Sequence, residues 1–301
     1  MDRTSVDWTG PMPAVTTPFR ADGSIDERSF ADNCLRLIAD GATGVVAGGC
    51  TGEFWALSHD ERKRLAIVAK EAVGSRGTVL VGTGAVTVAA TVALAGLAEA
   101  VGCDGVLILP PYFVKLSDDE IVAHFRDVDA AVGVPIVAYN IPGNAVNALT
   151  PAIVSRLADL DRVVAVKESS GDWNNYYATY LAVHERIRVF CGPSSVFGVP
   201  AVDLGADGTI DCFPNVWSPG GLDLYFAPAK GERARAAEVQ ALGRRLTDLF
   251  TSGGRTLYPA TKAAMDMMGL PGGGTPRRPL RPLEGAALAG LEAGLKDLGL
   301  I

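Results

Sequence analysis

Residues 163–172 read VVAVKESSGD, a short apolar run that ends in Lys167 and then in a polar turn. Runs of four to eight apolar residues bounded by turn residues are typical of a strand that is buried on both faces. The same pattern recurs along the chain at intervals of roughly 20 to 35 residues, and segments with helical periodicity fill the intervals. The alternation predicts βα units around a parallel sheet.

Eight such runs are present, and eight βα units close into a (β/α)8 TIM barrel. They lie at residues 13–17, 44–48, 78–82, 105–109, 135–139, 163–167, 187–191 and 208–212. Capping boxes that begin at Ser24, Ser58 and Ser117 mark helix starts in phase with these strands. After the eighth run only helical patterns remain, over residues 221–250, 256–268 and 283–298. We therefore predict a catalytic barrel over residues 1–220 and a C-terminal helical region over residues 221–301.

Composition narrows the class of protein. The chain has 301 residues, 48% of them hydrophobic, and a net charge of -7. An acidic chain offers no basic field for nucleic acid, and no apolar stretch has the length of a membrane span or the layout of a signal peptide. We expect a cytoplasmic protein with no nucleic-acid or membrane partner. The five cysteines and three histidines lack metal-binding spacing, and the fragment Gly82-Thr83-Gly84 lacks the third glycine of a dinucleotide loop. We expect no metal and no cofactor.

Lys167 is the first candidate for chemistry. It ends a valine-rich strand, and in a barrel the C-terminal strand ends surround the active site. Desolvation there disfavours the ammonium and leaves a neutral amine that can attack a carbonyl carbon. The alternative is a lysine that closes a strand because its ammonium reaches water past the strand end.

Two further features would meet Lys167 at the barrel mouth. Tyr139 ends the adjacent fifth strand, where a phenol can transfer protons, although buried tyrosines often only pack. The glycine-rich turn 48–53 can direct backbone N–H groups and the Thr51 hydroxyl at a carboxylate, although it can also be a plain tight turn. Together an amine, a phenol and an N–H nest predict a 2-oxo acid that is bound by its carboxylate and attacked at C2.

At these motifs the chain resembles the family of dihydrodipicolinate synthase and N-acetylneuraminate lyase, which are class I Schiff-base lyases on a (β/α)8 barrel. The matching segments are residues 49–53, 139–142, 167–172 and 205–210, followed by Asn215. The resemblance implies that Lys167 forms the imine and that Tyr139 is the proton-transfer phenol. The substrate-binding residues it suggests are Gly49, Cys50, Thr51, Asn144, Ser194, Ile210, Asp211 and Asn215.

The chain departs from this family's pattern at several positions. Cys50 and Phe113 stand where the synthase has a threonine and a tyrosine that relay protons, so that relay is broken. Asn144 stands where the synthase uses an arginine for its second substrate's carboxylate, and a neutral amide does not replace a bidentate cation. Ser194-Ser195 replaces the acidic pair of the sialic-acid branch.

These departures point away from the synthase and sialic-acid branches, and residues 52–55, 110–112 and 144–146 look closer to the branch that acts on 2-keto-3-deoxy sugar acids. The resemblance therefore suggests a lyase, either an aldolase or a dehydratase, with a substrate of that kind. The alternatives are 4-hydroxy-tetrahydrodipicolinate synthase, which joins pyruvate to aspartate semialdehyde, and a sugar-acid-binding barrel without turnover. The resemblance also suggests a homo-oligomer, either a tetramer or a dimer, in which Tyr112 and Phe113 approach the site of a neighbouring subunit.

Overall fold

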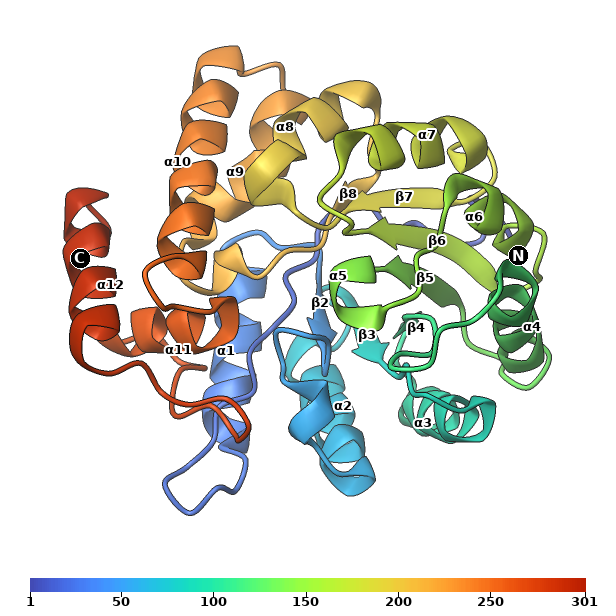
Figure 1. Cartoon of the computed structure of the whole chain (residues 1–301), viewed down its shortest axis with the longest axis horizontal. Coiled ribbons are helices and arrows are strands. Elements are labelled where there is room, and N and C mark those ends of the chain that lie inside the picture. Colours follow the sequence, from blue (N-terminus) through green and yellow to red (C-terminus); the bar gives the residue numbers. More distant parts are fainter.

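The computed structural model describes all 301 residues and shows a barrel of eight parallel strands (Figure 1). The strands are β1 (Gly10–Pro11), β2 (Gly44–Ala47), β3 (Thr78–Gly82), β4 (Gly105–Ile108), β5 (Ile136–Asn140), β6 (Val163–Glu168), β7 (Arg188–Cys191) and β8 (Gly208–Thr209). Neighbouring strands pair in the order β1-β8-β7-β6-β5-β4-β3-β2. A parallel bridge between Ala14 and Val46 brings the first segment against β2. The predicted (β/α)8 barrel is confirmed.

Helices follow the strands around the outside. They are α1 (Glu27–Ala39), α2 (His59–Val73), α3 (Val88–Val101), α4 (Asp118–Asp129), α5 (Pro142–Ala145), α6 (Pro151–Leu157), α7 (Trp173–Val183) and α8 (Ser194–Leu204), with 3-10 turns η1 (Phe54–Ala56) and η2 (Phe213–Asn215). The capping boxes at Ser58 and Ser117 are present, each with its reciprocal glutamate. The box predicted at Ser24 is wrong, because the carboxylate of Asp26 caps α1 by accepting from the N–H of Ser29.

The first strand lies earlier than the sequence pattern predicts. We predicted residues 13–17, whereas β1 is Gly10–Pro11. Pro11 and Pro13 face β2 and have no N–H to give to it, so regular pairing cannot form on that side of the segment. Ala14 and Val15 still donate single hydrogen bonds to Asp211 and Val46 on the two sides.

The C-terminal helices also differ from prediction at one point. Residues 221–250 were predicted as one helix, but they form α9 (Ser218–Ala229) and α10 (Arg233–Thr251). The break falls at Gly231, which adopts a φ of 73° that favours glycine. The helices α11 (Leu257–Met267) and α12 (Gly285–Asp297) complete the chain. Their buried side chains share a cluster with Cys212 and Phe213, which follow β8.

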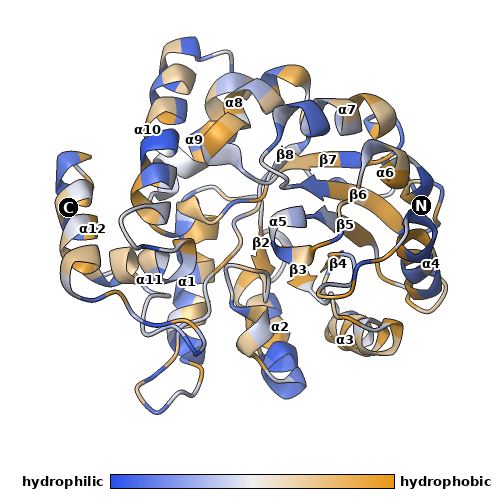
Figure 2. Ribbon diagram, viewed as in Figure 1, coloured by the Kyte–Doolittle hydropathy of each residue, from blue (hydrophilic) through white to orange (hydrophobic).

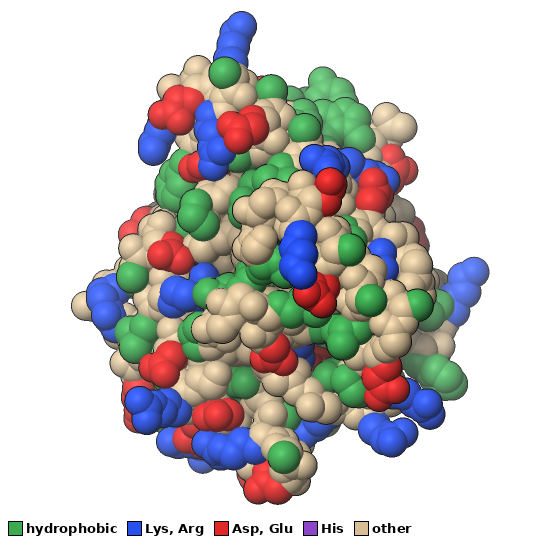
Figure 3. Space-filling model, turned by 90° about the vertical axis from the view of Figure 1, so that its left-hand side faces the viewer, with side chains coloured by type: hydrophobic (Ala, Val, Ile, Leu, Met, Phe, Trp, Pro, Cys, Tyr) green, Lys and Arg blue, Asp and Glu red, His purple; other side chains and the backbone are tan.

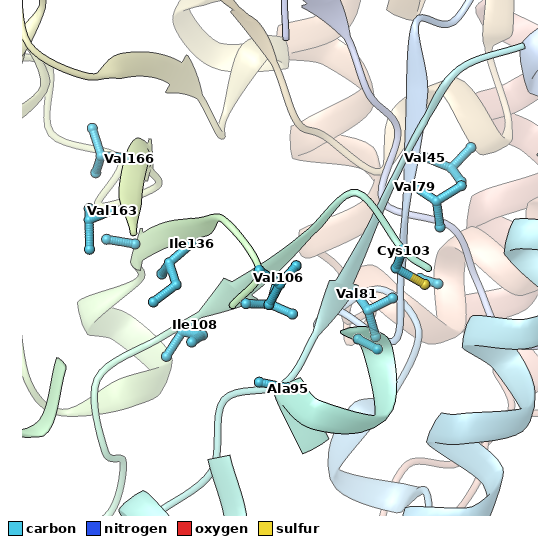
Figure 4. Close-up of a cluster of buried hydrophobic side chains, with 14 of the residues drawn as sticks. Val45, Val79, Val81, Ala95, Cys103, Val106, Ile108, Ile136, Val163 and Val166 are labelled. Atoms are coloured by element: carbon cyan, nitrogen blue, oxygen red, sulfur yellow. The ribbon is translucent and has the colours of Figure 1, made fainter. Parts of the chain in front are cut away.

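Side chains of the strands alternate between two cores. Val79, Val106, Ile136 and Val166 belong to the cluster that packs under the helices (Figure 4). The intervening residues, such as Leu80, form a second cluster inside the barrel. The strands are accordingly hydrophobic along much of their length, while hydrophilic residues gather on outer helices such as α4 (Figure 2).

The surface carries both signs of charge. On the face formed by the C-terminal helices, Lys and Arg side chains alternate with Asp and Glu, without a continuous basic area (Figure 3). None of the helices is both long enough and apolar enough to cross a membrane.

Candidate active site

The site is a cavity of about 190 Å³ at the C-terminal ends of the strands, and residues from opposite sides of the barrel line it. Its lining includes seven of the predicted site residues: Gly49, Cys50, Thr51, Tyr139, Lys167, Ile210 and Asp211. Side chains of α10 and α11 close its outer side. The (β/α)8 topology therefore brings together residues that lie more than a hundred positions apart in the sequence.

Lys167 and Tyr139 face each other inside the barrel. They are register partners on β6 and β5, and the Lys167 Nζ lies 4.2 Å from the centroid of the Tyr139 ring. Only 6% of Lys167 is exposed. Burial lowers the pKa of its amine, and the nearby Cys50 and Asp211 only partly oppose this effect. The amine is thus held toward its neutral, nucleophilic form.

The strand alternation that points these two residues inward points their neighbours outward. Asn140 and Glu168 are the next register pair, and the Asn140 Nδ2 donates to the Glu168 Oε1 at 2.7 Å. The backbone N–H of Ser170 donates to the same oxygen at 2.9 Å. These buried bonds tie the ends of β5 and β6 together on the face of the sheet opposite to the amine and the phenol.

The phenol of Tyr139 is also desolvated. Its hydroxyl donates to the Cys50 Sγ at 3.8 Å. Burial, together with the neighbouring Cys50 and Tyr258, raises the pKa of Tyr139 well above its usual value. Burial likewise raises the pKa of the Cys50 thiol, although Lys167 opposes the shift. Both groups are therefore protonated at neutral pH and able to donate.

The turn after β2 leaves hydrogen-bond donors free at the cavity wall. Gly48 adopts a φ of 60°, and the chain then turns so that Gly52 and Glu53 donate back to the carbonyls of Gly49 and Cys50. The N–H groups of Cys50 and Thr51 have no acceptor within the protein. Successive free N–H groups in a tight turn form a nest for an anion.

The opposite end of the cavity is polar. The Asp211 Oδ2 accepts from the Ser194 hydroxyl at 2.8 Å and from the Ser195 N–H at 3.0 Å. Thr247 of α10 donates to the Ser195 hydroxyl at 2.9 Å and lines the cavity together with Thr251. Ser194 itself is buried behind Asp211 and does not line the cavity.

Besides Ser194, four of the predicted residues lie outside the cavity of a single chain. Asn144 is exposed on α5, and Tyr112 packs edge-on against Phe54 with ring centroids 5.9 Å apart. Phe113 is 89% exposed and adopts a φ of 74°. Asn215 is buried and saturated: its amide donates to the carbonyls of Ala14 and Cys212 and accepts from the Asn33 amide.

Sequence reasoning missed Tyr258, Thr247 and Thr251. Tyr258 stands in the first turn of α11, and its ring lies 5.3 Å from that of Trp55. The buried carboxylate of Glu53 pairs with the buried ammonium of Lys262, one turn further along α11. In the sequence, Lys262 stands out as a lysine within an apolar helical segment, and this was the available signal that α11 lies at the site. Its partner Glu53 can be identified only from the fold.

A barrel whose mouth holds a desolvated amine, a protonated phenol and a free N–H nest is the arrangement of a class I lyase. The chain belongs to the dihydrodipicolinate synthetase family, whose sequence model matches residues 7–298. No group of three or more His, Cys, Asp and Glu side chains is placed to hold a metal ion. The family match confirms two predictions: that the chain belongs to this family, and that it is a class I lyase.

Similar proteins cover the chain almost completely. A 4-hydroxy-tetrahydrodipicolinate synthase of Moorella thermoacetica is 34% identical over 98% of this chain and 99% of its own. An uncharacterized DapA-like lyase of Rhizobium meliloti is 33% identical over 98% and 97%. The structure of YagE from E. coli K12 in complex with pyruvate superposes with a TM-score of 0.91 at 29% identity, and covers 98% of this chain and 99% of that one.

Proposed function

We propose that this lyase forms a Schiff base between Lys167 and a small 2-oxo acid, and that its substrate is a 2-keto-3-deoxy sugar acid. The observation that carries the proposal is the pairing of the buried Lys167 amine with the Tyr139 phenol, 4.2 Å from amine to ring centroid, inside a small cavity. The YagE structure in complex with pyruvate supports the choice of a 2-oxo acid.

The cavity suggests an order of events. The substrate carboxylate accepts from the free N–H groups of Cys50 and Thr51, which directs C2 toward Lys167. The neutral amine attacks C2 and gives a carbinolamine. Tyr139 protonates the carbinolamine oxygen, which leaves as water, and the imine remains. The imine then accepts the electron pair released when the C3–C4 bond breaks, or stabilises the carbanion from which a C4 hydroxyl leaves.

The outer end of the cavity favours a hydroxylated tail. Asp211, Ser195, Thr247 and Thr251 offer carboxylate and hydroxyl groups there. Lys167 is the only cationic side chain that lines the cavity, and it is consumed by the imine. A substrate with several hydroxyl groups and one carboxylate fits this lining, because the second end needs no cation.

The second candidate is 4-hydroxy-tetrahydrodipicolinate synthase, which the name of the Moorella relative favours. Aspartate semialdehyde brings a second carboxylate, and burying it without a cation is costly. Asn144, which stands at the position of the expected arginine, is neutral and exposed. We therefore rank this activity second, and a binding barrel without turnover third.

Borohydride trapping tests the proposal. Wild-type protein is incubated with pyruvate and borohydride and digested, and the modified peptide is located by mass spectrometry. We expect the adduct on Lys167, none on the other buried lysine, Lys262, and none in Lys167→Ala. A screen of 2-keto-3-deoxy acids with five and six carbons, run beside pyruvate with aspartate semialdehyde, then assigns the substrate. If pyruvate with aspartate semialdehyde were turned over and none of the 2-keto-3-deoxy acids were, the synthase activity would rank first. An unmodified Lys167 would refute the imine.

A further inference from the structure

Tyr139 needs a route for protons, because it is only 4% exposed. Each time it gives its proton to a carbinolamine oxygen it must regain one, and bulk water does not reach it directly. Its hydroxyl contacts the Cys50 Sγ at 3.8 Å, and Cys50 is itself only 8% exposed. Cys50 therefore offers a route by which the proton can return from a group that lies nearer the solvent.

Tyr258 is placed to be that group. The Cys50 thiol lies next to two phenols, that of Tyr139 and that of Tyr258. The side chain of Tyr258 lines the same cavity as that of Tyr139. Unlike Tyr139 and Cys50, Tyr258 is only partly buried. The exposure of the three residues thus increases in the order Tyr139, Cys50, Tyr258.

Two contacts hold Tyr258 in this position. Trp55 packs against its ring, with centroids 5.3 Å apart. One turn along the same face of α11, Lys262 forms the buried ion pair with Glu53. Trp55 and Glu53 both belong to the turn that follows β2 and carries Cys50, so the thiol and Tyr258 are fixed relative to each other.

We propose that Tyr258 is the outer member of a proton relay, Tyr139–Cys50–Tyr258, which is completed within one subunit. When the carbinolamine oxygen takes the Tyr139 proton and leaves as water, the Cys50 thiol gives its proton to the resulting phenolate. The thiolate takes the proton of Tyr258, which is restored from water at the cavity mouth. Because a thiol is ordinarily a stronger acid than a phenol, the first return step is favourable. This inference rests on the imine chemistry proposed above.

The test measures how fast, and how completely, the imine forms. Protein is mixed with saturating pyruvate and quenched with borohydride at increasing times, and the adduct on Lys167 is quantified. For Tyr258→Phe, which keeps the ring against Trp55, we expect the rate to fall by about 10²-fold or more while the final adduct is unchanged, on the scale that is typical of general acid–base groups. Tyr177→Phe, at an exposed tyrosine of α7, is the matched control and keeps the wild-type rate.

Cys50 variants separate a relay from mere packing. Cys50→Ser retains a donor and acceptor and should keep the rate within a few-fold of wild type, whereas Cys50→Ala should slow it as Tyr258→Phe does. Members of one relay act as a unit, so Cys50→Ala/Tyr258→Phe should be no slower than Cys50→Ala alone. A wild-type rate in Tyr258→Phe, or multiplicative losses in the double variant, would overturn the relay and leave the imine standing. Failure of wild-type protein to form the adduct would overturn both.

Discussion

Removal of the Glu53 charge should destabilise the protein and disturb its active site together. Glu53 and Lys262 have side-chain exposures of 0% and 1%, so no water replaces a lost partner. Glu53→Gln preserves the side chain's shape, and its amide oxygen can still accept from the Arg277 N–H, which donates to the Glu53 Oε2 at 2.9 Å. The variant therefore removes little besides the charge opposite Lys262.

Breaking a buried ion pair on one side costs about 3 to 5 kcal/mol, because the remaining charge stays buried without its partner. At typical unfolding entropies, a chain of 301 residues loses about 1.6 °C of Tm for each kcal/mol, so Glu53→Gln should lower Tm by about 5 to 8 °C. Glu53→Gln/Lys262→Met, which leaves no buried charge at this position, should recover most of the loss.

Scanning calorimetry at fixed pH and protein concentration provides the measurement. The matched control is Asp248→Asn, which removes an exposed ion pair with Arg244 and should cost less than about 1 kcal/mol. A loss in Glu53→Gln no larger than in this control, or a double variant less stable than Glu53→Gln, would refute the reasoning. Because Lys262 and Tyr258 share α11, Glu53→Gln should also slow imine formation at temperatures where it remains folded.

Four further predictions concern three residues: Tyr139, Lys167 and Asn215. Tyr139→Phe should slow turnover by roughly 10²-fold while pyruvate still binds, and unchanged turnover would remove Tyr139 from proton transfer. Burial lowers the pKa of Lys167, so imine formation should decline only as pH falls through that lowered pKa, and a decline that begins at the ordinary pKa of lysine would contradict us. Because the pKa of Lys167 is lower in the folded protein than in the unfolded chain, the unfolded chain binds the proton of this amine more tightly, and the lysine costs stability at neutral pH. Lys167→Met should therefore stabilise the fold at neutral pH, by an amount that shrinks as pH rises. Asn215→Ala should cost about 1 to 3 kcal/mol in denaturant unfolding, because it strands the carbonyls of Ala14 and Cys212, and should leave KM unchanged; a raised KM would instead place Asn215 at the substrate.

The alternation of apolar runs was sufficient to predict the barrel, because each βα unit can be recognised from its own short stretch of sequence. Lys167 and Tyr139 could be placed in one cavity for the same reason, since the ends of adjacent parallel strands meet. Asn215 shows the limit of a motif: its position was identified, but its amide is occupied by the chain's own carbonyls. Tyr258 shows a second limit, since only tertiary packing brings α11 against the turn that follows β2.

The two ends of the cavity are held by different parts of the chain, and this separates chemistry from specificity. The amine and the phenol depend on the register of β5 and β6, which the bond between Asn140 and Glu168 secures from outside the barrel. The outer end depends on Thr247 and Thr251 of α10, which can change without disturbing that register. Substitutions on α10 should therefore alter which 2-oxo acids are accepted while leaving imine formation with pyruvate intact. Changes at Tyr258 should instead slow imine formation, because this residue of α11 lies beside the Cys50 thiol.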